Sequence, residues 1–264
     1  MLVAVSIAGL SGACANTGQQ ILEFATTKPG QSVTPTPVAA GGSELDRATA
    51  YWKERYKKDP RDVKAAISFA QNLKASGNKR GAYAVLQQAS VLHGDNKELA
   101  SEYGRLALEF GQLELAGKLL DSAYDPARPD WKLLSARGAV LGKLGRFQEA
   151  IGQFERARSL APNQPSLTNN LAMAYVAAGQ LSKAETLLRT IALAPNATPR
   201  MRQNLSLVLG LQGRYTEAKA LAAADGADAE AYARIDRLKK MTQARGTTKP
   251  GKRHYTGATA ALRR

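Results

Sequence analysis

The amino-acid sequence predicts an all-α protein folded as a solenoid of antiparallel helix pairs, and three observations support this. Glycines recur every 34 residues, and an alanine follows each of them five residues later. Ahead of each glycine, small and apolar residues recur at helical spacing, as Leu171, Ala172 and Tyr175 do. The aromatic content is only 6%, which fits Ala- and Leu-rich helices better than a β-sandwich. The periodic residues are Gly77, Gly111, Gly145, Gly179 and Gly213, with Ala82, Ala116, Ala150, Ala184 and Ala218.

A fixed period of 34 residues resembles that of the tetratricopeptide repeat (TPR), which implies a right-handed superhelical solenoid. Glycine is suited to end the first helix of each pair because it tolerates a positive φ. Alanine on the second helix lets the two helices of a repeat cross closely. Pro60 and Pro162 are expected to end second helices, since proline lacks the amide donor and disfavours helix in the residue before it. We interpret the periodic residues as packing residues rather than functional sites.

The chain begins with a segment that is typical of export. Residues 2–13 are apolar or small and precede Cys14, the only cysteine, and the run is too short to span a membrane. Residues 1–14 resemble a bacterial lipoprotein signal with Leu10-Ser11-Gly12-Ala13-Cys14 as its processing box, which implies a lipid on Cys14. Ser11 stands where leucine is usual, and no Lys or Arg precedes the apolar run. The alternative is an ordinary cysteine in an N-terminal tail.

The residues after Cys14 predict the cellular location of the protein and a linker. Ala15 follows the cysteine instead of the aspartate that usually retains such proteins in the inner membrane. The resemblance therefore implies the outer membrane, with the protein on its periplasmic face. Residues 15–43 are rich in Pro, Gly, Ser and Thr, a composition typical of a flexible linker.

The folded part is expected to span residues 44–242. Ser43 is expected to cap an N-terminal helix that ends at Asp59-Pro60. A last helix, at about residues 227–242, has one apolar and one polar face, as the end of a solenoid requires. Between them we expect five repeats, at 63–96, 97–130, 131–164, 165–198 and 199–226.

Positive charge is concentrated at the C-terminal end. The chain carries a net charge of +15, and nine Lys or Arg but no acid lie from residue 237 onward. We expect residues 243–264 to form a disordered basic tail. Such a tail can bind nucleic acid, but in an exported protein we expect a solvated end that touches anionic lipid or an acidic partner. Nucleic acid is therefore not the expected partner.

No pattern in the sequence indicates an enzyme. His93 and His254 lie in no ligand-like or catalytic spacing, and a single cysteine excludes a Cys-based zinc cluster. Gly138, Gly142 and Gly145 lie on and after a predicted helix rather than after a strand, so they do not form a phosphate-binding loop. We expect no cofactor, no metal and no small-molecule substrate.

The first helices of the repeats are expected to line a concave groove through their second, fifth, ninth, twelfth and thirteenth positions. Basic side chains in such a groove suit the carboxylates or the acidic helix of a protein partner. The alternative is that they are ordinary solvated positions on a helix. The candidates are Lys64, Gln71, Lys74, Arg105, Lys132, Ser135, Lys143, Asn169, Arg200 and Gln203.

Two asparagines have a different expected role. Asn170 and Asn204 occupy the same repeat position and are expected to face the neighbouring repeat. A buried amide there would bond free backbone groups between repeats, so we interpret both residues as structural.

The last two repeats resemble in sequence the TadD family, the TPR lipoproteins of the tight-adherence (Flp) type IV pilus assembly system. The similarity covers about residues 44–222 and is specific over 165–220, where the motifs are Asn169-Asn170-Leu171-Ala172, Gly179-Gln180-Leu181-Ser182-Lys183-Ala184-Glu185 and the run from Arg202 to Tyr215. It implies a non-catalytic scaffold that binds a component of the pilus secretion machine, with the outer-membrane secretin as a candidate. The basic tail departs from the family. The alternatives are a generic periplasmic TPR assembly factor for another envelope system and a cytoplasmic nucleic-acid-associated TPR protein.

Overall fold

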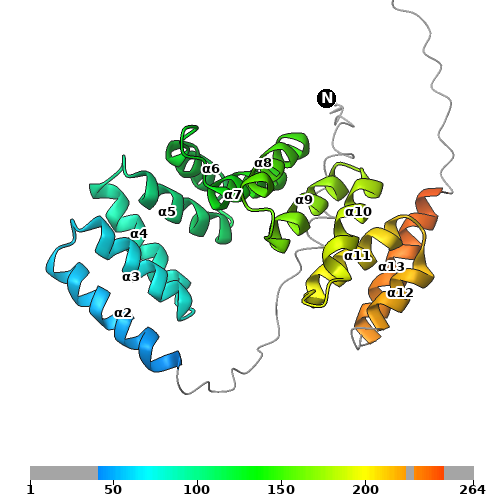
Figure 1. Cartoon of the computed structure of the whole chain (residues 1–264), viewed down its shortest axis with the longest axis horizontal. Helices are drawn as coiled ribbons and strands as arrows, with labels where there is room; N and C mark the ends of the chain where they lie inside the picture. Colours follow the sequence, from blue (N-terminus) through cyan, green and yellow to red (C-terminus); the bar gives the residue numbers. More distant parts are fainter. Residues whose placement is uncertain (1–40, 224–228, 247–264) are drawn as a thin grey trace, which may run out of the picture.

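The computed structural model describes residues 41–223 and 229–246, and these ranges contain twelve α-helices and no strand (Figure 1). The predicted all-α solenoid of TPR type is confirmed. The predicted signal, most of the predicted linker and most of the predicted basic tail lie outside the described residues. The helices are α2 (Gly41–Lys58), α3 (Val63–Ala75), α4 (Lys79–Leu92), α5 (Lys97–Glu109), α6 (Leu113–Ala123), α7 (Trp131–Lys143), α8 (Phe147–Leu160), α9 (Pro165–Ala177), α10 (Leu181–Ala192), α11 (Pro199–Leu211), α12 (Tyr215–Ala223) and α13 (Ala229–Gly246).

Helices α3 to α12 form five consecutive pairs, and the first helix of each pair begins 34 residues after the previous one. Polar N-caps define most of these starts. Asp62 accepts the backbone N–H of Ala65, and Asn96 accepts that of Leu99. Helix α9 has no side-chain cap bond, but Pro165 at its start has a φ that already suits a helix.

The turn within each pair depends on glycine. The five periodic glycines have φ values between 75° and 85°, and they are the only described residues with positive φ. The five periodic alanines are at most 1% exposed. A Cβ placed on Gly142 would lie 3.9 Å from the Cβ of Ala150, so the two helices of the third pair cross closely at this point.

The first helices form one continuous layer. Helix α3 contacts α5, α5 contacts α7, α7 contacts α9, and α9 contacts α11, whereas the contacts of the second helices are mainly with the first helices beside them. Figure 1 shows the pairs following an arc, with α7 on the inner side of α6 and α8. We call α3, α5, α7, α9 and α11 the first-helix layer.

Buried leucines join successive repeats. Leu99, Leu167, Leu120 and Leu188 are at most 1% exposed; the first two lie near the starts of first helices and the other two lie on second helices. The largest cluster of buried side chains runs from Ala150 to Leu238, so it includes the end helix α13. The solenoid core is therefore continuous through its C-terminal half.

Both end helices differ from expectation at their outer boundaries. Helix α2 begins at Gly41, so Ser43 lies within its first turn instead of capping it. This is possible because the first amides of a helix need no intrahelical acceptor. Helix α13 continues past residue 242 to Gly246, since Gln243, Ala244 and Arg245 favour helix and the next strong breaker is that glycine. No helix in the described ranges has the length and apolar character to cross a membrane.

Candidate protein-binding face

The ten candidate residues all lie on first helices, but their exposure differs. Those that are exposed are Lys64, Gln71, Lys132, Lys143, Arg200 and Gln203. Lys74, Arg105 and Ser135 are half-buried, and Asn169 is buried.

The N-terminal part of the layer, α3 and α5, neutralises its own charges. Lys74 Nζ lies 2.5 Å from Glu109 Oε1, and Lys79 Nζ from α4 lies 2.8 Å from the other oxygen of this carboxylate. Glu102 receives a 3.2 Å hydrogen bond from Gln71 Nε2 and an ion pair from Arg105. Lys74 and Arg105 therefore hold acids of the same layer.

The pKa of Glu109 reflects this pairing. Its burial on its own would raise the pKa, but hydrogen bonds from Lys74 and then Lys79 outweigh the burial and hold the pKa below its ordinary value. Glu109 thus remains charged and keeps Lys74 engaged, so Lys74 is poorly placed to capture a partner's carboxylate.

The C-terminal part of the layer has a different charge pattern. Helices α7, α9 and α11 carry five Lys or Arg and no acid. Residues 131–223 as a whole hold 12 Lys or Arg and 4 acids, whereas residues 44–130 hold 14 and 13. The positive charge of the solenoid is therefore concentrated in repeats three to five. The five cations of this layer are Lys132, Arg137, Lys143, Arg200 and Arg202.

Some of these cations have structural contacts. Arg137 lies 2.8 Å from Asp121 and stacks over the Tyr124 ring at 4.5 Å. Arg202 donates to the Ala197 carbonyl oxygen. Lys132 lies 5.7 Å from the centroid of the adjacent Trp131 ring and stays exposed, as does Arg200. A carboxylate partner can therefore approach this part through exposed Lys132 and Arg200.

The four acids of repeats three to five all lie on second helices, where they have partners. Arg146 lies 2.5 Å from Glu149, and the Tyr175 hydroxyl donates to Glu155 at 2.7 Å. The other two, Glu185 and Glu217, belong to a network that joins α10 to α12. Their partners in these contacts are Arg146, Tyr175, Arg189 and Arg214, which are not among the five cations of the first helices.

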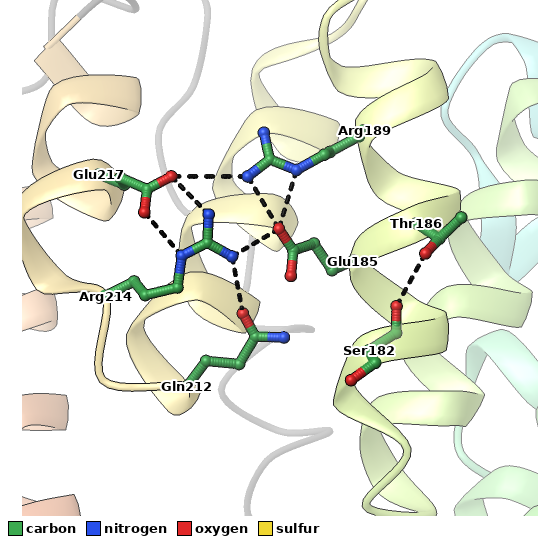
Figure 2. Close-up of polar contacts among 7 residues, drawn as sticks. All are labelled: Ser182, Glu185, Thr186, Arg189, Gln212, Arg214 and Glu217. Atoms are coloured by element: carbon green, nitrogen blue, oxygen red, sulfur yellow. Dashed lines mark hydrogen bonds and ion pairs between the residues drawn. The ribbon is translucent and has the colours of Figure 1, made fainter.

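Figure 2 shows this network. Arg214, which precedes α12, bonds Glu217 and Glu185 at 2.6 Å each, and Arg189 also bonds Glu185. Partial burial would raise the pKa of Glu185, but hydrogen bonds from Arg214, Arg189 and Gln212 together lower it. The network links the second helices of neighbouring repeats and explains why these acids are not available elsewhere.

The predicted roles of the asparagines require correction. Asn169, expected in the groove, is 5% exposed and its Oδ1 accepts a 2.7 Å hydrogen bond from Asn204 Nδ2. Asn204 is buried at the repeat junction as expected, but its partner in this bond is a side chain rather than the backbone. Asn170 is only half-buried. The reason is that α9 and α11 lie close enough for the two amides to meet, which removes Asn169 from the accessible face.

One contact was missed by the sequence reasoning. Tyr124 lies beneath Arg137, and its hydroxyl receives a 2.6 Å hydrogen bond from Arg156. The signal was a break in the period, because Arg137 occupies a position filled by Phe69 and Leu171 in other repeats. An arginine at a core position requires such an aromatic and acidic partner.

The described ranges contain no group of three or more His, Cys, Asp or Glu residues that could hold a metal ion. The exposed cations of the first-helix layer can form charge-assisted hydrogen bonds, which suit the binding of carboxylates.

Comparison with known proteins agrees with the fold. Residues 143–208 match the family model described as tetratricopeptide repeat. No curated protein gives a significant match to the sequence.

Several solved structures are similar. The APC/C hetero-tetramer Cut9-Hcn1 aligns with a TM-score of 0.62 at 21% identity over 76% of this chain, which spans only 40% of that chain. Pseudomonas aeruginosa pilF aligns with a TM-score of 0.57 at 15% identity, over 88% of this chain and 96% of its own. YrrB, described as a TPR protein with an unusual peptide-binding site, aligns with a TM-score of 0.53 at 16% identity, over 75% of this chain and all of its own (100%). At these identities the likeness shows the fold alone.

Proposed function

We propose that the protein is a non-catalytic scaffold that binds an acidic segment of a protein partner on helices α7, α9 and α11. The TPR fold in general indicates protein-protein interaction. The observation that carries the proposal is the separation of charge within the first-helix layer. Five cations and no acid lie on α7 and α11, and of these Arg137 pairs with Asp121 of α6. On α3 and α5, Lys74 and Arg105 pair with acids of the same layer, Glu109 and Glu102.

The partner is proposed to be a component of the tight-adherence pilus machine, with the outer-membrane secretin as the candidate. The support is the resemblance of residues 165–220 to TadD proteins. YrrB is described as having a peptide-binding site, and an extended acidic peptide is the kind of ligand that the cationic helices suit. The alternative is a generic periplasmic assembly factor with the same fold. Pilus genes beside the gene for this protein would favour the pilus proposal.

The binding test compares charge reversals at matched positions. Lys132→Glu with Lys143→Glu should lower co-purification of a tagged secretin on the order of tenfold, because each reversal replaces attraction with repulsion. Lys64→Glu is the control, since Lys64 occupies the same repeat position as Lys132 but lies on α3, where Lys74 is paired with Glu109. Equal capture of the secretin by the parent, the double variant and Lys64→Glu would contradict the proposal. Unchanged melting temperatures would exclude misfolding.

The proposed location is the periplasmic face of the outer membrane, with a lipid on Cys14. Mass spectrometry of the protein from native membranes, beside a Cys14→Ala variant, tests this. A lipid-modified N-terminal cysteine in outer membranes, lost in the variant, is the expected result. An unmodified protein outside the envelope would rule out the location and weaken the pilus proposal.

A further inference from the structure

Two neighbouring loops of the solenoid present exposed leucines on the same edge. Leu160 ends α8 and is 45% exposed, and Leu193 follows α10 and is 61% exposed. Both residues lie where a second helix turns into the first helix of the next repeat. Because α8 packs on α9 and α10 packs on α11, the two loops are consecutive along the stack. We call residues 158–166 and 189–203 the leucine edge.

The leucine edge is cationic and contains no acid. Its arginines are Arg158, Arg189, Arg200 and Arg202. Arg200 is exposed, and the Arg189 side chain keeps 38% of its surface exposed although it pairs with Glu185. Four prolines and several uncharged polar residues complete the edge.

The corresponding loops elsewhere carry acids. The loop between α4 and α5 contains Asp95, and the loop between α6 and α7 contains Asp125 and Asp130. Leu92 is as exposed as Leu160 and occupies the same repeat position, but it lies three residues before Asp95. Among the described loops that lead from a second helix into a first helix, the combination of exposed leucine, arginine and no acid occurs only between α8 and α9 and between α10 and α11.

This combination suits the interfacial zone of a lipid bilayer. Leucine side chains at loop tips can enter the boundary between headgroups and acyl chains, and arginines beside them can bond lipid phosphates. Cations gain further from a negative surface, and the absence of acid removes the opposing repulsion. We propose that the leucine edge docks on the surface of a bilayer that contains anionic phospholipid.

This docking shares Arg200 with the proposed partner-binding face, but it needs neither a protein partner nor a lipid on Cys14. It therefore adds a second membrane contact, through the folded domain, to the proposed anchor. Purified protein and vesicles suffice to test the docking. Membrane docking can therefore be refuted while the proposed partner binding is upheld, and partner binding can be refuted while docking is upheld.

The test uses the full chain as Cys14→Ala, co-sedimented with phosphatidylcholine vesicles with or without phosphatidylglycerol. Leu160→Ser with Leu193→Ser should weaken binding to the anionic vesicles about tenfold, because the inserted apolar surface is lost. The matched control is Leu92→Ser with Leu144→Ser, whose leucines are 48% and 46% exposed but lie outside the leucine edge. The control should stay within about twofold of the parent.

A charge variant gives an independent readout. Arg200→Gln should weaken binding about fivefold, and the difference should shrink at high salt. Lys64→Gln, at the same repeat position as Arg200 but beside the α2–α3 loop with its acids Asp59 and Asp62, should have a smaller effect. The basic residues beyond 246 are present in every variant, so differences between variants report the edge.

Three outcomes would overturn the proposal. One is equal loss of binding in the leucine-edge and control variants, and another is binding that is indifferent to phosphatidylglycerol. The third is unchanged vesicle binding together with lost secretin capture in Leu160→Ser with Leu193→Ser, which would assign the edge to a protein contact. Circular dichroism should show the same melting temperature for both double variants, since the substituted side chains are exposed.

Discussion

Two glycines allow the repeat turn to be tested without any change in packing. Gly179 has a φ of 75°, and a Cβ added there would meet no atom within 4 Å. Gly152 lies inside α8, and a Cβ added there would also meet nothing. Replacing each with alanine therefore changes the backbone preference alone.

The two replacements should have opposite signs. Alanine in the left-handed region costs about 1–2 kcal/mol, and the reduced entropy of the unfolded chain offsets about half of this. Gly179→Ala should thus lower the free energy of unfolding by about 1 kcal/mol. Gly152→Ala should raise it by about 1 kcal/mol, because alanine favours helix over glycine by that amount.

For a domain of this size, a difference of about 2 kcal/mol separates the two melting temperatures by about 4–8 °C. Thermal unfolding followed by circular dichroism at one protein concentration measures it. Gly179→Asn should fall between the parent and Gly179→Ala, since asparagine tolerates positive φ better. If Gly179→Ala melts at or above the parent, the left-handed turn is not what ends the first helix.

Three further predictions concern packing, charge and the end of the stack. Ala150→Phe should lower stability by about 1–3 kcal/mol and the melting temperature with it, because Ala150 is fully buried near Gly142. The pKa of Glu185 is lowered in the fold, so the stabilisation from its charged form is present above the unfolded pKa and is lost as the pH falls through the folded pKa. The parent should therefore be more stable than Glu185→Gln at neutral pH. Urea titrations should show this difference in the free energy of unfolding shrink as the pH is lowered toward about 3. Gly210→Ala places a Cβ 2.6 Å from Leu238 Cδ2, so amide hydrogen exchange should accelerate in α13 and stay unchanged in α3.

The helix pairs were predictable because their signals are local. Each periodic glycine needs a positive φ, and each periodic alanine marks a crossing, so a repeat predicts its own turn without knowledge of its neighbours. The outer helix boundaries were less predictable. Ser43 is a preferred cap residue, but α2 begins two residues before it at Gly41. No strong breaker stands at residue 242, so α13 extends to Gly246.

The partners on the candidate face depend on the distance between neighbouring first helices, which no single helix encodes. Lys74 meets Glu109, and Asn169 meets Asn204. In both pairs the residues are 35 positions apart, one more than the repeat period. Comparing residues at that separation would have indicated that Lys74 is paired and that Asn169 is internal. The same comparison finds no acid that could pair with Lys132 in the next first helix.

Helix α13 determines that the stack stops after five pairs. Ile235 and Leu238 cover the last pair, and Leu238 occupies the space that the missing side chain of Gly210 leaves open. Without this cover, the last pair would present an apolar surface of the kind on which a further repeat normally packs. A second molecule could then add end to end, and such a head-to-tail contact does not close. The packing of Leu238 against Gly210 thus covers the end of the stack and prevents end-to-end growth into a filament.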